Sequence, residues 1–190
     1  MKFQQLIIAL AASSIAATAF AAADTYTIDS RHTFPSFEAD HMGLSVWRGK
    51  YTKTSGTVTL DKANKTGAID ILIDASSIDF GLEAMNAHAK KDDIFDVAKH
   101  PTVTYKSKSI TFTGDVPTSI NGELTLKGVT KPVTLTINKF KCIMHPMLKK
   151  EVCGADASAS FNRADFGVTK GIPMFSPEVK LAIQVEAVKN

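Results

Sequence analysis

The feature that most constrains this chain is a regular alternation of apolar and other side chains. In GAIDILIDAS, residues 67–76, isoleucines occupy positions 69, 71 and 73, with two aspartates and a leucine at the positions between and after them. Side chains that repeat every second residue lie on one face of a β-strand. The stretch therefore predicts a strand with Ile69, Ile71 and Ile73 on its covered face.

The same alternation recurs along the chain. Further runs of this kind are SGTVTLD, PTVTYKS, KSITFTG, INGELTLKG, KPVTLTINKF, ADASASF and EVKLAIQVEA. Turn-forming residues punctuate them at 64–67, 114–117, 121–122 and 127–128. About eight strands with short connections predict an all-β fold, an antiparallel sandwich or barrel rather than a βαβ arrangement.

One stretch, LEAMNAHAKKDDIFDVAKHP at residues 82–101, has a different period. Leu82, Met85 and Ala89 recur at helical spacing, which predicts one helical insertion in the β fold. His88 and Asp92 are spaced to share a metal ion, but two ligands make an incomplete site. A histidine that packs at the inner edge of the helix and donates a hydrogen bond is the favoured interpretation.

The first residues predict a secretory signal peptide. A lysine at position 2 precedes an apolar run at 6–17 and the small-residue pattern Ala19-Phe20-Ala21. We expect a cleaved segment at 1–21, extending at most to 23, and a single domain at 22–190. The apolar run is shorter than the roughly 20 residues of a membrane-spanning helix, so we expect no transmembrane segment. The expected location is the periplasm of a Gram-negative cell, or the exterior by secretion.

Charge and cysteine content narrow the classes further. Loss of Lys2 leaves 21 basic against 19 acidic residues, and a net charge of about +2 does not indicate nucleic-acid binding. Export favours a disulfide between the only two cysteines, Cys142 and Cys153. The alternative is a metal site that adds His145, but the segment offers no fourth ligand.

Local catalytic motifs are absent from the sequence, including the nucleophile elbow, the zinc-protease helix and the phosphate-binding loops. Their absence lowers the expectation of an enzyme without excluding one, because a catalytic triad assembles from distant residues. A barrel of about eight strands holds one small ligand or is filled by its own side chains. The alternation leaves both possibilities open.

Short motifs follow one another in a characteristic order. They are YTID at 26–29, H-x-G at 41–43, ASSID at 75–79, IFDVAKHP at 94–101, GVTKPV at 128–133 and NRADFG at 162–167. The ordered set closely resembles the YceI family of periplasmic proteins over essentially the whole chain after the signal peptide. The resemblance implies a lipocalin-like, extended, antiparallel up-and-down β-barrel with an elongated apolar pocket. The resemblance also implies that the helix packs against the barrel and helps to shape this pocket.

The resemblance also implies a function. It indicates a periplasmic carrier, without catalysis or a metal, that holds an isoprenoid or fatty-acyl chain such as the tail of ubiquinone or of a polyprenyl phosphate. Family members often carry Arg-Asp where this chain has Met85-Asn86, which favours a neutral head group such as a quinone. The resemblance is compatible with a homodimer. Two rivals stay open: a filled barrel acting as an interaction module, and a periplasmic hydrolase using His41, His88 and a nearby carboxylate.

Candidate ligand-binding residues follow from the inward positions and the resemblance. Those expected along the lipid tail are Phe37, Trp47, Ile71, Ile73, Phe80, Met85, Phe95, Phe161 and Phe166. Those expected near the head group are His41, Asn86 and His88.

Overall fold

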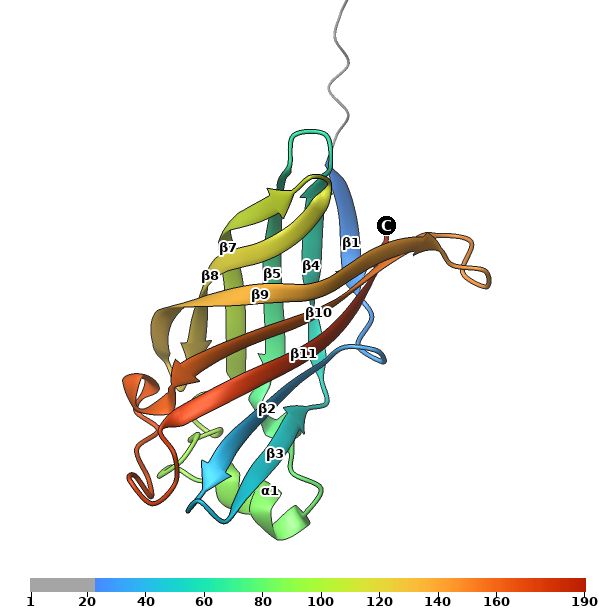
Figure 1. Ribbon diagram of the computed structural model, residues 1–190. Coiled ribbons are helices and arrows are strands. Elements are labelled where there is room, and N and C mark those ends of the chain that lie inside the picture. The colour runs from blue at the N-terminus through green and yellow to red at the C-terminus, as the bar shows by residue number, and fades with distance from the viewer. Residues whose placement is uncertain (1–22) are drawn as a thin grey trace, which may run out of the picture.

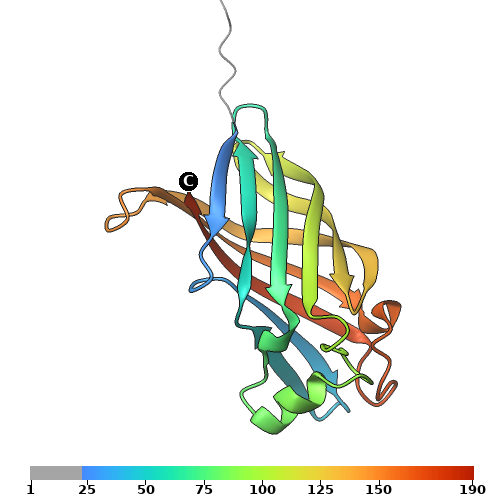
Figure 2. The same ribbon diagram turned by 180° about the vertical axis from the view of Figure 1, so that it is seen from behind.

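The protein is an antiparallel β-barrel with one α-helix (Figures 1 and 2). The computed structural model describes residues 23–190, so the expected signal peptide at 1–21 lies outside the described residues. In the described part of the chain, no helix combines the length and the apolar character needed to cross a membrane.

Residues 23–190 form eleven strands, one α-helix and two 3₁₀ turns. The strands are β1 (Asp24–Ile28), β2 (Phe34–His41), β3 (Ser45–Tyr51), β4 (Thr54–Asp61), β5 (Thr66–Asp74), β6 (Ile78–Asp79), β7 (Thr102–Thr113), β8 (Val116–Leu126), β9 (Val129–Met144), β10 (Glu151–Asn162) and β11 (Glu178–Lys189). The helix α1 is Glu83–Ala89, and the 3₁₀ turns η1 and η2 are Ala75–Ser77 and Arg163–Phe166.

Eight of these strands close a ring. β1 pairs with β4 on one side and with β11 on the other, which joins the two ends of the series β1-β4-β5-β7-β8-β9-β10-β11. The remaining strands extend the wall beyond β1, because β2 pairs with Lys180–Gln184 of β11 while β1 pairs with its last residues, and β3 and β6 follow. The prediction of a closed antiparallel barrel of about eight strands is confirmed.

The alternation in β5 has the predicted meaning. Ile69, Ile71 and Ile73 point to the barrel interior, while the Leu72 side chain between them is 45% exposed on the outer surface. Closing the ring leaves no unpaired edge among its eight strands, so each inner face is covered by the others.

The turn predicted at Asn121-Gly122 is wrong. Both residues lie inside β8, where Gly122 pairs with Ser107 and Val133. A Cβ atom at Gly122 would lie 2.5 Å from the Tyr105 ring, so this glycine serves a close approach rather than a turn. The chain instead reverses at Gly114, whose φ of +61° suits glycine.

The predicted helix is correct in place but shorter than the helical pattern. Helix α1 stops at Ala89, and the remaining residues to Pro101 form turns. The amide of Phe95 donates to the Ala89 carbonyl, and Asp96 has a positive φ of +48°, so the chain folds back after about two turns of helix. This folding back places Phe95 against the barrel end that α1 also covers.

Candidate functional site

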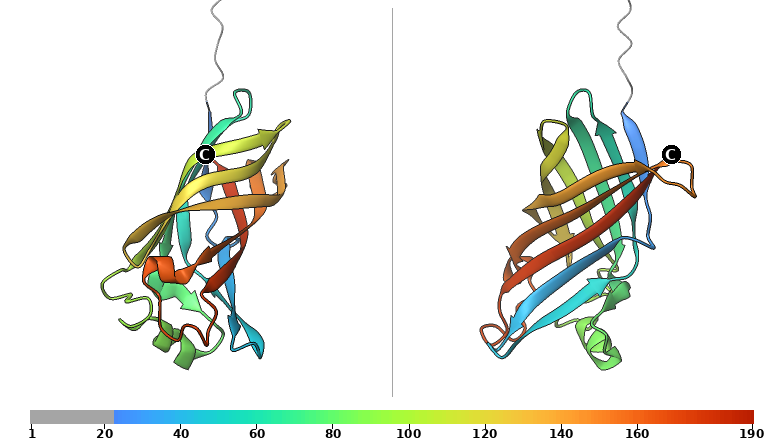
Figure 3. Two further views of the ribbon diagram at one scale, coloured as in Figure 1. Left: turned by 60° about the vertical axis from the view of Figure 1, so that its left-hand side comes forward. Right: turned by 45° about the vertical axis from the view of Figure 1, so that its right-hand side comes forward.

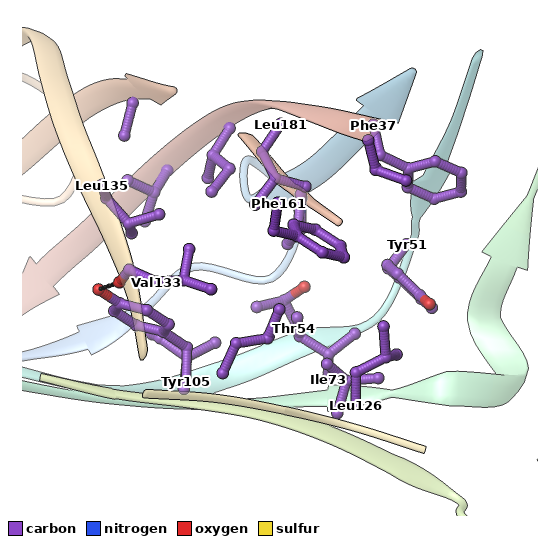
Figure 4. A pocket seen from close by; sticks show the side chains of 18 of the residues that line it. Phe37, Tyr51, Thr54, Ile73, Tyr105, Leu126, Val133, Leu135, Phe161 and Leu181 are labelled. Atoms are coloured by element: carbon purple, nitrogen blue, oxygen red, sulfur yellow. Dashed lines mark hydrogen bonds between the residues drawn. The ribbon is translucent and has the colours of Figure 1, made fainter. Parts of the chain in front are cut away.

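The barrel encloses one long cavity of about 490 Å³ (Figure 4). Its wall consists almost entirely of apolar side chains from the inner faces of the strands, with Ile71 and Ile73 from β5 and Leu124 and Leu135 from β8 and β9 as examples. A cavity of this size and polarity lies in the range that binds small apolar ligands.

Hydroxyl groups interrupt the apolar wall, among them those of Tyr105, Tyr51 and Thr54. The Tyr105 hydroxyl lies 2.9 Å from the Val133 carbonyl oxygen and 3.1 Å from that of Ile120, and burial raises the pKa of Tyr105 to about 12. Burial also raises the pKa of the Tyr51 hydroxyl far above its usual value. The Thr54 hydroxyl is buried and has no hydrogen-bond partner within residues 23–190. Figure 4 shows all three side chains in the cavity wall.

The cavity opens at the end that carries α1. The lining residues Asp40, Trp47 and Lys170 are exposed, and all three belong to that end, whereas Tyr26 and Leu60 at the opposite end are buried. Figures 1 and 3 show α1, the β2–β3 turn and the loop between η2 and β11 together at this end of the barrel. These three segments form the mouth of the cavity.

Aromatic stacking shapes one side of the mouth. The His41 ring stacks on Trp47 at 5.0 Å and on Phe175 at 4.7 Å between centroids. Next to them, the Met42 amide donates to the Met174 carbonyl at 3.1 Å, which joins the β2–β3 turn to the loop before β11. The apolar side chains of Met42, Met174 and Leu44 are 49%, 59% and 80% exposed, so the rim is apolar as well.

Arg163 holds the same loop, between η2 and β11, from the barrel side. Its guanidinium donates to the carbonyl oxygens of Ser176 and Val168 at 2.9 Å and of Lys170 at 3.0 Å. Burial lowers the pKa of Arg163. The sequence analysis quoted this residue in NRADFG but assigned it no role. The NRADFG motif was the sequence signal that pointed to it, because a guanidinium carries five N–H donors and can bind several loop carbonyls at once.

Most of the predicted ligand-binding residues lie in the cavity wall. The structure places there Phe37, His41, Trp47, Ile71, Ile73, Phe80, Met85, His88, Phe95 and Phe161. Whether each contacts a ligand stays a prediction.

Asn86 and Phe166 lie outside that wall. The Asn86 amide nitrogen donates to Asp79 Oδ1 at 2.9 Å, and its oxygen accepts from the Phe80 amide at 2.7 Å, so its hydrogen bonds tie α1 to β6. Phe166 is 1% exposed and packs edge-on behind Phe161, with ring centroids 5.1 Å apart. Phe166 was expected along the lipid tail and Asn86 near the head group, but the sequence pattern does not show in which layer a side chain lies.

The two histidines of the rival hydrolase differ in surroundings. His41 is stacked between the aromatic rings of Trp47 and Phe175, and His88 lies on α1 in the cavity wall. Within residues 23–190 neither ring hydrogen-bonds to the nearby carboxylate that the hydrolase hypothesis expects.

The cysteines form the predicted disulfide. Cys142 and Cys153 face each other directly in the β9–β10 ladder, with their Cα atoms 4.0 Å apart. Glu151 lies beside them, but bonded sulfur atoms are not thiolates and do not ligate a metal. The Glu151 carboxylate accepts instead from Tyr26 and from Lys62.

A closed antiparallel barrel with a deep apolar cavity and a single lipophilic mouth defines the class of lipocalin-like ligand-binding barrels. Within that class the sequence is specific: the profile described as a YceI-like domain matches residues 26–187. Protein YceI of Salmonella arizonae and that of Salmonella paratyphi B are each 34% identical over 182 residues, which cover 94% of both chains. The chain belongs to the YceI family.

Solved structures agree with the fold. BcnA of Burkholderia cenocepacia has a TM-score of 0.69 at 23% identity, covering 84% of this chain and 98% of the other. The YceI protein of Campylobacter jejuni gives 0.67 at 23% identity, with 80% and 90% covered. A polyisoprenoid-binding domain of Saccharophagus degradans, implicated in plant cell wall breakdown, gives 0.64 at 15% identity, with 87% and 98% covered.

Proposed function

We propose that this protein is a periplasmic carrier that sequesters an isoprenoid lipid in its barrel. The observation that carries the proposal is the cavity of about 490 Å³, which is walled by apolar side chains and whose exposed lining residues, Asp40, Trp47 and Lys170, lie at the α1 end. Each methylene of a lipid tail that leaves water contributes about 0.8 kcal/mol before ordering costs, so a long chain binds with few polar contacts. The polyisoprenoid-binding domain of similar fold supports this ligand class.

The charges around the cavity favour a neutral head group such as the quinone of ubiquinone. The cationic side chains that line the cavity are those of Arg163 and Lys170. Arg163 already donates to loop carbonyls, and Lys170 forms an ion pair with Asp93. A phosphate head would need a cation that is not already engaged. A carbonyl head needs only hydrogen-bond donors, and the hydroxyls of Thr54 and Tyr51 are available.

The periplasmic location rests on the expected signal peptide, and lipid sequestration without turnover rests on the cavity chemistry. A filled barrel that works only through its surface is a poorer account, because the cavity is large and the rim around its mouth is apolar.

The test is native mass spectrometry of protein purified from a bacterial periplasm without detergent, followed by organic extraction. We expect a stoichiometric isoprenoid, and its head group would distinguish a quinone from a polyprenyl phosphate. A bare protein mass that persists after incubation with both lipids would refute the carrier function.

A matched pair of variants locates the ligand. Ile71→Glu puts a charge into the cavity wall and should reduce lipid retention at least ten-fold, because burying an unpaired carboxylate next to a lipid tail is costly. Leu72→Glu changes the neighbouring residue on the outer face and should leave retention unchanged. If both variants retain the lipid equally well, the cavity is not the binding site.

A further inference from the structure

The β9–β10 hairpin carries an apolar tip that stands clear of the barrel. The exposed fractions of Ile143, Met144, Met147 and Leu148 are 45%, 68%, 83% and 44%. Figure 1 and the right-hand view of Figure 3 show the hairpin projecting past the barrel wall. Apolar side chains scattered singly on a surface need no explanation, but four within six residues at one tip do.

The hairpin end is cationic, with two lysines in β9 and two in the tip loop. Lys139, Lys141, Lys149 and Lys150 are all exposed, and the segment 139–150 contains no aspartate or glutamate. None of the four lysines forms an ion pair within residues 23–190.

The two nearest carboxylates in the ladder do not neutralise this charge. Glu151 is engaged by Tyr26 and Lys62, and Asp156 lies opposite only the most distant lysine, Lys139.

The hairpin is held in its projecting shape from within. The Cys142–Cys153 disulfide crosses its base. At the tip, the His145 amide donates to the Lys150 carbonyl at 2.9 Å, and the His145 ring nitrogen Nδ1 accepts from the amides of Met147 and Leu148 at 3.3 and 3.2 Å. The backbone of the tip is therefore satisfied by its own groups, and the apolar side chains are left to face outward.

We propose that this hairpin docks the protein on an anionic phospholipid bilayer. The four apolar side chains of the tip enter the interfacial region of the bilayer, and the four lysines of the hairpin contact the phosphate head groups. Long lysine side chains reach past an inserted apolar tip to a charged surface. The charge of the hairpin is complementary to an anionic membrane, and the apolar tip supplies the burial that charge alone does not.

The size of the tip argues for a bilayer over a protein partner. A specific protein interface buries about 800 Å² on each side, formed by about 20 or more residues. Four apolar side chains on a narrow, convex hairpin do not offer such an area, whereas they suffice for shallow insertion into a bilayer. The tip also lies away from the α1 end, so docking leaves the cavity mouth unobstructed (Figure 1).

The proposal is tested by sedimentation of the protein with vesicles of phosphatidylethanolamine and phosphatidylglycerol, compared with pure phosphatidylcholine. We expect binding to the anionic vesicles that weakens with salt. Each lysine near an anionic surface contributes about a five-fold change in partition, so Lys149→Gln with Lys150→Gln should reduce it about 25-fold. Met147→Ser with Leu148→Ser should reduce it at least ten-fold.

The matched control changes exposed apolar residues at the cavity mouth. Leu44→Ser with Met174→Ser removes a similar apolar area from the rim, and this variant should bind vesicles as the parent protein does. Circular dichroism and a thiol assay check that every variant keeps its fold and its disulfide.

Three results would overturn the proposal. The first is no partition of the parent protein onto anionic vesicles, and the second is a loss of binding in the rim variant instead of the hairpin variants. The third is lipid-free self-association that Met147→Ser with Leu148→Ser abolishes, which would assign the tip to a second copy of the chain. These results are distinct from failure of the carrier function, because vesicle binding is measured without reference to the cavity ligand.

Discussion

Thr54 shows how a single residue marks the cavity. Its side chain occupies an inward position of β4 in an otherwise apolar wall, and its hydroxyl has no partner within residues 23–190. A buried hydroxyl without a hydrogen bond costs about 1–3 kcal/mol. In the strand TSGTVTLD, residues 54–61, the threonines at 54, 57 and 59 look alike, so no pattern distinguishes the one at the strand's start that turns inward. A ligand in the cavity would best supply the hydrogen-bond partner of the Thr54 hydroxyl.

Replacing the Thr54 hydroxyl tests the free-energy cost of burying it without a hydrogen bond. Thr54→Val keeps the shape of the side chain and should raise the free energy of unfolding of the ligand-free protein by about 1 kcal/mol. Urea denaturation measures it. Thr57→Val, on the exposed face of the same strand, is the control and should change little. A clear loss of stability in Thr54→Val would mean that the hydroxyl has a partner in the folded protein.

At the scale of elements, helix α1 and its tether decide the form of the mouth. The helical spacing of 82–101 correctly predicted a helix beside the barrel, but it could not show where the helix ends. The end depends on the positive φ of Asp96 and on the turn from Phe95 back to Ala89, which are set by packing against the barrel. The strands were easier to predict, because their two-residue period extends over long runs and the ring covers one face of each.

The Asn86 amide is the tether that the sequence did not reveal. Asn86→Leu removes both the donor to Asp79 and the acceptor for the Phe80 amide, and should lower the free energy of unfolding by about 1–3 kcal/mol. Hydrogen exchange should quicken at the Phe80 amide and across α1. Glu83→Gln, on an exposed position of the same helix, is the control. Unchanged exchange at Phe80 would show that packing alone holds α1 in place.

Across the whole molecule, the three tyrosines report on the closure of the barrel. Tyr26, Tyr51 and Tyr105 are the only tyrosines, and each is buried, from the closed end to the mouth. Burial raises the pKa of each phenol, and in Tyr26 the hydrogen bond to Glu151 raises it further. The eight-strand ring that buries them was predictable from the number and spacing of the strands. The extension by β2, β3 and β6 was not, because a two-residue period predicts a strand but not the neighbour with which that strand pairs.

These buried phenols predict that the folded protein loses stability at alkaline pH. The folded state holds its tyrosines protonated above pH 10, where the unfolded chain releases them, so the stability is complete below about pH 10 and falls as pH rises toward 12. The expected loss is about 1.4 kcal/mol per pH unit for each tyrosine. Tyrosinate absorbance and far-ultraviolet circular dichroism should change together in one transition. Tyrosinate that forms well before the fold is lost would show that water reaches the phenols in the intact barrel.

Because β1 pairs with β11, Asp24 and Asn190 at the two ends of the barrel domain lie close together. The Asp24 carboxylate lies 2.6 Å from the Lys189 amine, and the amide of Asn190 donates to the Thr25 carbonyl at 2.9 Å. Joining these neighbouring ends with a short linker and cutting the exposed turn between β4 and β5 would give a circular permutant with the same strand neighbours. The joined ends lie opposite α1, so a protein immobilised on a sensor chip through them would present its opening to the solution (Figure 1).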